Sequence, residues 1–455
     1  MSTLPPVTGI LARFVAETDY SNFSEKAREN GKLHILDTLG AALAAVSTPT
    51  ATIAFDYCKA WGGAPEAAVW GTRNRFPAAL AAFANGLLGH ALDYDDWDAF
   101  VHAGHPTSIV AAAAIALGEA KGSTGTEVLA SYILGIEVLT RLAGGGPNLQ
   151  ARGFHSTPVL GSLGAAATCA RLLRLAPEKV AAALGIAASA ASGIQRQQGT
   201  MVKPFHAGNA ARSGIEAALL AERGFTADPA ILEAPRGFCD TFFGAGAWDA
   251  DKIIGGLGNP WFLESPGLGF KLHPCSAPQF LAADAALHLK RQHNIDFAQV
   301  EKVTVSVPPL RHQRHYHAEV KTGLRGKFAV NYVVALCMLD GRLELETFSD
   351  ERVNAPDAQD ALRRVEVIAD ATIPEPGPYC PVTVELRSGG RLSYTATVPK
   401  GHPDNPLTVD EVTGKFRSNA RLAFSAERIE RVAHTVLNLE TVADARELAQ
   451  LLAAA

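Results

Sequence analysis

Alanine-rich segments with helical periodicity run almost without interruption through the first 265 residues of the chain. Apolar residues recur there every three to four positions, and glycine or proline stands at nearly every junction. Alanine is the strongest helix former, and long runs of it favour closely packed helices. The pattern therefore predicts a tightly packed all-α domain. Its clearest segments lie at 26–46, 77–92, 108–121, 126–143, 158–173, 177–193 and 207–223.

The pattern changes after Pro266. Residues 300–307 alternate valine with polar residues, and 364–369 is similar, as expected of β-strands. Two further alternating runs, 382–386 and 392–398, flank a Ser-Gly-Gly turn and predict a hairpin. Helical segments near 278–290 and 328–339 lie between these strands, which indicates an α+β domain.

The helical pattern returns after Pro403, with segments at 408–421, 424–437 and 440–453. The sequence therefore predicts a mainly α protein of two domains. A large all-helical domain is formed by 1–266 together with 403–455, and a smaller α+β domain, 267–402, is inserted into it. A chain of 455 residues is long enough for two such cores.

Composition and charge narrow the function classes. The net charge of −5 gives no reason to expect nucleic acid or an anionic membrane as a partner. The six cysteines are widely spaced and form no CxxC pair, so neither a disulfide framework nor an iron–sulfur cluster is indicated. The first twenty residues do not resemble a secretion signal, and the most apolar stretches are typical of buried helices. We expect a cytoplasmic protein.

Four acids and three histidines lie within sixteen residues, from His90 to His105. His105 directly precedes Pro-Thr-Ser at a helix start, where backbone N–H groups and the helix dipole favour anions. The alternative, about equally plausible on these residues alone, is that the acids cap helices and the histidines are exposed. The spacing contains neither an HExxH pattern nor a Cys/His tetrad, so we predict no metal.

Three other positions stand out. His155 precedes Ser156-Thr157-Pro158, where Ser156 or Thr157 is expected to cap a helix. Lys203 precedes Pro204, which disfavours helix at the lysine and predicts a fixed turn. Lys271 lies at the junction of the two predicted domains, and such junctions often bind ligands. Taken singly, each lysine is better explained as a solvated surface charge. The glycine-rich stretches do not follow a strand, so nucleotide binding is not indicated.

Several long motifs, in the right order, resemble the MmgE/PrpD family over nearly the whole chain. They are Asn85-Gly86, His90-Ala-Leu-Asp-Tyr-Asp-Asp96, His105-Pro-Thr-Ser108, Gly135-Ile-Glu137 with Arg141, Gly153-Phe-His-Ser-Thr157, Gly199-Thr-Met-Val-Lys-Pro204, Ala210-Ala-Arg-Ser-Gly214 and Lys271-Leu-His-Pro-Cys275. The resemblance implies a large helical domain, a smaller α+β lid and a homodimer. It also implies action on a small polycarboxylate without metal or organic cofactor, because the family includes 2-methylcitrate dehydratase, cis-aconitate decarboxylase and iminodisuccinate epimerase.

The resemblance also implies which residues form the active site: Asp93, His105, His155, Lys203 and Lys271. Two positions depart from the decarboxylase pattern. Trp97 stands where threonine is common, and Ser276 stands where the decarboxylase has histidine and dehydratases often have cysteine. Because the carbanion left by decarboxylation needs a proton donor at that place, these departures count against decarboxylation. Dehydration of a 2-methylcitrate-like acid is the first choice, because the resemblance makes it a leading activity of the family. An epimerase is the second choice, a decarboxylase is less favoured, and a non-catalytic carboxylate binder is the third possibility.

All these reactions share a carbanion beside a carboxylate, and preorganised cations stabilise such charge best. We expect Lys203 and Lys271 to hold substrate carboxylates, together with His155, Ser276 and the N–H groups of the helix starts that follow His105 and His155. Histidine is suited to proton transfer near neutral pH, so His105 and His155 are predicted as base and acid in either order. Asp93 is expected to orient one imidazole.

Overall fold

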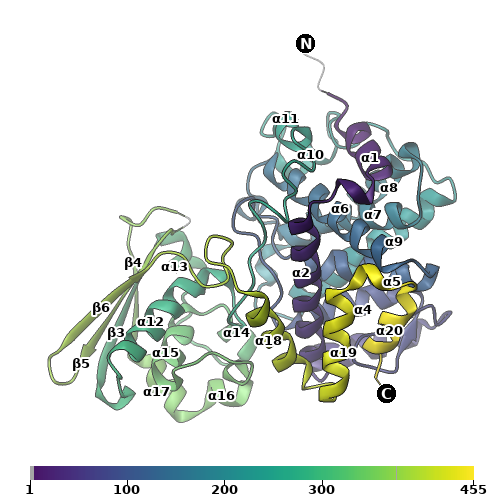
Figure 1. The fold of residues 1–455 in the computed structure, drawn as a ribbon. Helices are drawn as coiled ribbons and strands as arrows, with labels where there is room; N and C mark the ends of the chain where they lie inside the picture. The colour runs from purple at the N-terminus through teal and green to yellow at the C-terminus, as the bar shows by residue number, and fades with distance from the viewer. Residues whose placement is uncertain (1–4, 376, 455) are drawn as a thin grey trace. The chain divides into compact units, whose positions relative to one another are not determined.

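A computed structural model of the chain describes residues 5–375 and 377–454. The chain divides into two compact units. The first comprises the residues up to Gln197, Met201–Phe270 and the residues from Thr408 onward, and the second comprises Gln198–Thr200 and Lys271–Leu407. The boundaries predicted from the sequence, after 266 and 402, lie a few residues before these. The predicted mainly α fold is confirmed, since helices dominate the order of elements (Figure 1).

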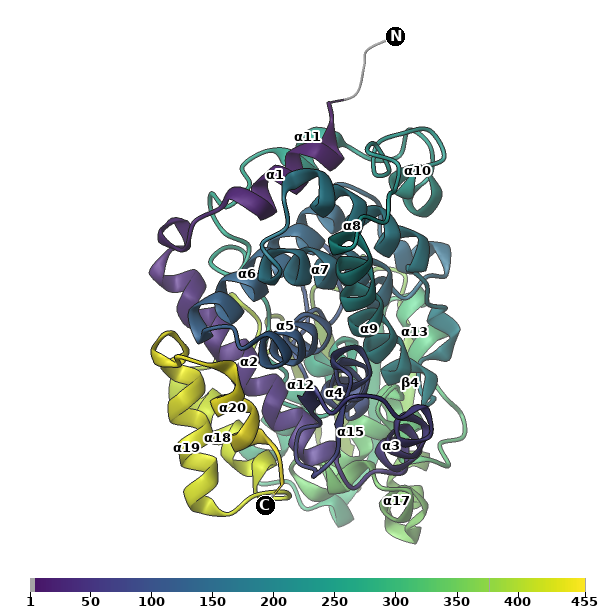
Figure 2. The ribbon, with the colours of Figure 1, turned by 90° about the vertical axis from the view of Figure 1, so that its right-hand side faces the viewer.

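The first unit is helical except for a two-residue pairing of β1 (Ala67–Ala68) with β2 (Arg75–Phe76). Helix α5 lies at its centre, surrounded by α4, α6, α7 and α9 (Figure 2). All but the last two residues of α5 are buried, as its run of alanines requires. The described helices of this unit are α1 (Val7–Glu17), α2 (Glu25–Ala45), α3 (Pro49–Trp61), α4 (Ala78–Ala91), α5 (Thr107–Lys121), α6 (Gly125–Gly144), α7 (Ser156–Leu172), α8 (Pro177–Ala190), α9 (Val202–Glu222), α10 (Phe238–Phe243), α11 (Ala250–Ile254), α18 (Val409–Ala420), α19 (Ala426–Leu437) and α20 (Ala445–Leu452).

Two glycines allow the helices that matter for the site to approach closely. A Cβ atom at Gly208 on α9 would lie 2.3 Å from the carbonyl oxygen of Phe83 on α4, so a larger residue would push these helices apart. A Cβ atom at Gly40 on α2 would lie 3.1 Å from the Cα atom of Phe416 on α18. Close packing at these glycines sets α9 against α4, and the C-terminal helix α18 against α2.

The second unit contains a four-stranded sheet in the order β4-β3-β5-β6. β3 (Val300–Val307) pairs in parallel with β4 (Val365–Ala369) and antiparallel with β5 (Cys380–Leu386), which forms the predicted hairpin with β6 (Arg391–Ala396). Val303, Val305 and Val307 are buried, in keeping with the period-two pattern. Helices α12 (Phe280–Gln292) and α15 (Val330–Asp340) pack against the sheet (Figure 1). The remaining helices are α13 (Pro309–His315), α14 (Gly323–Gly326), α16 (Asp350–Asn354) and α17 (Pro356–Arg363).

Two local predictions were wrong. Helix α9 begins at Val202, so Lys203 lies in its first turn and not in a turn between helices. Pro204 is tolerated as the third helical residue because the N–H groups of a first turn have no acceptor within the helix. Helix α7 is not capped by Ser156 or Thr157, since His155 itself occupies the N-cap position and Ser156 is the first helical residue.

No single helix among the described residues has both the length and the apolar character to cross a bilayer; only α2 and α3 taken together, bent by 90°, meet that test. The six cysteines, all within the described residues, are buried and form no disulfides.

Candidate active site

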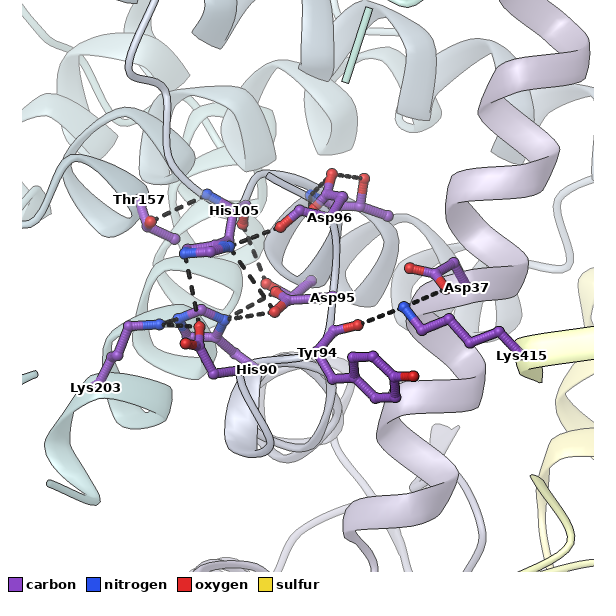
Figure 3. Close-up of polar contacts among 12 residues, drawn as sticks. Asp37, His90, Tyr94, Asp95, Asp96, His105, Thr157, Lys203 and Lys415 are labelled. Carbon is purple, nitrogen blue, oxygen red and sulfur yellow. Dashed lines mark hydrogen bonds and ion pairs between the residues drawn. The ribbon is translucent and has the colours of Figure 1, made fainter. Parts of the chain in front are cut away.

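Four segments of the first unit meet at the predicted site. They are the last turn of α4, the loop from 92 to 106, the start of α7 and the first turn of α9. Together they bring Asp93, His105, His155 and Lys203 into one group, to which His90 and Asp95 also belong. Figure 3 shows the side chains of His90, Asp95, His105 and Lys203 directed toward one another. Asp93 has a φ of 52°, a left-handed backbone conformation that is uncommon for residues other than glycine.

A buried lysine forms the centre of the group. Lys203 is 4% exposed, and its Nζ atom lies 2.7 Å from Asp93 Oδ1 and 2.7 Å from His90 Nε2. An ammonium group can only donate, so His90 Nε2 must accept. The proton of His90 is then on Nδ1, which donates to the carboxylate of Asp95 at 2.8 Å. Burial lowers the pKa of His90 despite the neighbouring Asp95, which agrees with this neutral imidazole.

His105 is fixed by its backbone and its ring. Its backbone N–H donates to Thr157 Oγ1 at 3.1 Å, and its Nδ1 atom lies 2.7 Å from the carbonyl oxygen of Asp96. A carbonyl oxygen only accepts, so Nδ1 carries a proton, and in the neutral ring Nε2 carries the lone pair. That Nε2 atom lies 3.8 Å from Asp93 Oδ1. The geometry suits His105 to act as a proton acceptor through Nε2.

His155 lies beside a histidine to which the sequence analysis gave no role. The Nδ1 atoms of His155 and His206 are 3.1 Å apart, and both side chains are buried. Burial and the nearby Lys203 ammonium hold the pKa of His155 well below its ordinary value. Burial also lowers the pKa of His206 to about 4. His206 is three residues after Lys203, so both side chains lie on one face of α9. This spacing would have revealed His206 if the helix had been predicted to begin at Val202.

The start of α5 is occupied by the protein's own carboxylate. Asp96 accepts hydrogen bonds from the backbone N–H of Thr107, at 3.2 Å, and from its hydroxyl. The Thr107 hydroxyl lies 2.7 Å from the hydroxyl of Tyr132. Burial raises the pKa of Asp96, and Asp95 raises it further. The expectation that N–H groups of this helix start bind substrate is therefore wrong for Thr107.

The start of α7 offers a better anion site. No side chain of the described part of the chain caps this helix, and its N-terminus carries a partial positive charge. Ser156 is fully buried, and its hydroxyl has no hydrogen-bond partner among the described residues. Because Ser156 directly follows His155, a carboxylate bound at this helix start would lie next to the imidazole.

His90, Asp93, Asp95 and His105 have ligand atoms within 4.8 Å of one another, a grouping that could hold a metal ion. However, Lys203 already binds both His90 Nε2 and Asp93 Oδ1, so a metal would have to displace a buried ammonium group. The arrangement therefore favours lysine as the cation of this site. The absence of a metal from the reaction stays a prediction.

Lys271 and Ser276 belong to the second unit. Lys271 is fully buried, and the backbone N–H of Ser276 donates to the carbonyl oxygen of Lys327 at 2.9 Å. The Nζ atom of Lys327 in turn donates to the carbonyl oxygen of Pro274 at 2.7 Å, so one residue fixes this segment at two points. The roles of Lys271 and Ser276 in substrate binding stay predictions.

Comparison with known proteins agrees with the motifs. Residues 9–251 match the MmgE/PrpD N-terminal domain, and residues 273–441 match the MmgE/PrpD C-terminal domain. The chain belongs to the MmgE/PrpD family. Its curated MmgE/PrpD relatives include the cis-aconitate decarboxylase of Homo sapiens, 29% identical over 99% of this chain and 95% of that protein. The Mus musculus decarboxylase is 27% identical over 99% and 94%, and that of Aspergillus terreus is 24% identical over 98% and 96%. These relatives are lyases.

Proposed function

We propose that this MmgE/PrpD protein is a cofactor-independent lyase that acts on a small tricarboxylate through a carbanion beside a carboxylate. The observation that carries the proposal is the buried Lys203 ammonium, held at 2.7 Å by both Asp93 and His90, next to two further imidazoles. A preorganised cation in a site with little water stabilises developing negative charge strongly. The three imidazoles provide proton acceptors and donors close to that charge.

The residues can divide the work as follows. Lys203 and the start of α7 at Ser156 bind substrate carboxylates, and the ammonium of Lys203 stabilises the carbanion. His105 takes a proton through Nε2, and His155 donates one. Asp93 orients Lys203 through their direct ion pair. Lys271 and Ser276 keep their predicted role in binding the substrate, which rests on the family resemblance.

Decarboxylation of cis-aconitate is the first reaction to test, because the similarity to decarboxylases of that name extends over almost the full length of both chains. In it a carbon–carbon bond breaks, CO2 leaves, and the electron pair on carbon takes a proton from the site. Dehydration of a 2-methylcitrate-like acid is the second candidate, favoured by Trp97 and Ser276 and by the acceptor at His105 Nε2. There His105 removes a proton from carbon, and the hydroxyl group takes a proton from His155 and leaves as water.

One experiment separates these reactions. The purified protein, treated with EDTA, is incubated in D2O with a panel of di- and tricarboxylates and followed by proton NMR. Loss of CO2 or of water would support the proposal and name the reaction. Deuteration with inversion would replace the lyase with an epimerase, and no change with any acid would overturn the proposal. The Lys203→Met variant, prepared in the same way, controls for contaminating activity.

A homodimer, a cytoplasmic location and independence from any metal are further parts of this proposal. Light scattering on the purified chain checks the first. Turnover that is neither lowered by EDTA nor raised by added divalent ions would support independence from metal. Activity that requires an added ion would contradict it.

A further inference from the structure

Lys415 is a buried lysine on α18, the first of the three helices that follow the second unit. It contacts the 92–106 loop, which carries Asp93 and Asp95 (Figure 3). The Nζ atom of Lys415 donates to the carbonyl oxygen of Tyr94 at 2.7 Å and lies 4.0 Å from the centre of the Tyr94 ring. The same atom forms an ion pair of 2.7 Å with Asp37 Oδ1 on α2. The side chains of Lys415 and Asp37 are 6% and 0% exposed. Lys415 therefore joins three separate segments of the first unit.

The position of Tyr94 gives this contact its importance. Tyr94 lies between Asp93, which binds Lys203, and Asp95, which binds His90. A displacement of the Tyr94 carbonyl group would therefore move both carboxylates at once. Asp93 also has a left-handed backbone conformation, which persists only where the surroundings hold it. Lys415 binds the carbonyl oxygen of the next residue, Tyr94, and this hydrogen bond can hold the backbone conformation of Asp93.

A second ion pair between a lysine and a carboxylate also joins α2 to the C-terminal part of the chain, and it provides a comparison for Lys415. Lys32, which lies on α2 as Asp37 does, forms an ion pair of 3.0 Å with Glu440 of the C-terminal segment. That pair is more exposed, at 15% and 29%, and it joins Lys32 to Glu440 and not to the 92–106 loop. A buried ion pair is weak support for stability, because its desolvation cost offsets much of its attraction. The burial of Lys415 is better explained by a need to fix geometry.

We propose that Lys415 is a positioning residue, which holds the Tyr94 peptide so that Asp93 and Asp95 keep Lys203 and His90 in their reactive arrangement. The activity arm of its test rests on the proposed lyase function. Its structural arm does not, because it needs no substrate.

The structural arm compares Lys415→Met with Lys32→Met by hydrogen–deuterium exchange and mass spectrometry. Lys415→Met should speed exchange in peptides covering residues 90–107, whereas Lys32→Met should leave them as in the wild type. Equal exchange in the two variants would overturn the proposal. If Lys415→Met does not fold, Asp37→Asn replaces it, because it weakens the anchor of the lysine and leaves the lysine itself in place. It should then speed exchange in the same peptides, and unchanged exchange would again overturn the proposal.

The activity arm measures kcat and KM on whichever tricarboxylate the NMR panel identifies. We expect Lys415→Met to lower kcat on the order of 100-fold, since small misplacement of catalytic groups costs about that much. KM should change little, and Lys415→Arg should restore part of kcat because a guanidinium group can donate to the same two oxygens. A variant with normal kcat but a lower unfolding temperature would show a merely structural role. If no acid is turned over, the lyase proposal fails while the exchange experiment still decides this one.

Discussion

The Nδ1 atoms of His155 and His206 lie 3.1 Å apart, so one ring must donate and the other must accept. If His206 donates, His155 carries its proton on Nε2 and can act as an acid. If His155 donates, its Nε2 atom bears a lone pair and can act only as a base. His206 thus decides the role of His155, although His206 itself is not proposed to transfer a proton to or from the substrate.

We expect His155 to carry its proton on Nε2, because His105 already provides an acceptor. Two-dimensional 15N–1H spectra of histidine-labelled protein at neutral pH report the tautomer of each ring. The His206→Leu variant should lose this preference in His155 and lower kcat on the order of 100-fold, the low end for a proton-transfer group. A His155 ring protonated on Nδ1 in the wild type would contradict its assignment as the acid.

Removing Lys203 should affect stability as well as activity. Lys203→Met deprives the buried Asp93 carboxylate of its counter-charge, which costs about 3–5 kcal/mol for a buried pair. The double variant Lys203→Met/Asp93→Asn removes both charges and should regain most of that loss. Urea unfolding of the three proteins measures the difference. Neither variant should turn over substrate, and a double variant as unstable as the single one would contradict the ion-pair argument.

His105 can be tested with a substitution that keeps its hydrogen bond. In His105→Asn the side-chain amide can still donate to the Asp96 carbonyl oxygen, but the Nε2 acceptor is gone. We expect a fall in kcat of about 10²–10⁴-fold, with stability within about 1 kcal/mol of the wild type. His105→Leu, the matched control, should lose both activity and stability. Steady-state kinetics and thermal unfolding decide, and a near-normal kcat in His105→Asn would remove His105 from the chemistry.

His34 should make the free energy of unfolding depend on pH. This ring is buried, stacks on Phe270 with 4.1 Å between centroids, and has its pKa lowered by burial to about 3. In the unfolded chain its pKa is about 6.5, so the unfolded state binds more protons between these values. The stability is therefore complete above about pH 6.5 and falls as the pH is lowered, by about 1.4 kcal/mol per pH unit.

The control for this prediction is His34→Leu, which cannot take up the proton. The stability of the variant relative to the wild type should improve steadily from pH 6.5 to pH 4.5 in urea unfolding experiments. A constant difference across that range would show that His34 is protonated in the folded protein.

Most of the longer helices of the first unit were predictable because each carries its own local signal, although α1 and α3 were not among the predicted segments. The predicted segment 108–121 corresponds to α5 (Thr107–Lys121), and 126–143 to α6 (Gly125–Gly144). Their apolar periodicity is local and their ends are marked by glycine or threonine. The start of α9 was missed because Pro204 sends the same local signal whether it ends a helix or occupies its first turn.

The site was predictable only in part, for a related reason. Asp93, His105, His155 and Lys203 were chosen from motifs, and the structure brings them together. His90 was noticed but given no role, because its partner Lys203 is 113 residues away and no local pattern records that contact. Nothing in the sequence singled out Lys415, whose contact with Tyr94 spans 321 residues.

The helical unit takes its last three helices from beyond residue 407, after the whole of the second unit. The N-terminus of a chain leaves the ribosome first, and domains tend to fold as they emerge. For this protein the loop that carries Asp93 and Asp95 leaves the ribosome some three hundred residues before the helix that supports it. A nascent chain interrupted between Lys203 and Lys415 would contain every proposed catalytic residue of the first unit and still lack its Lys415 support, so maturation of the site is a late event in its synthesis.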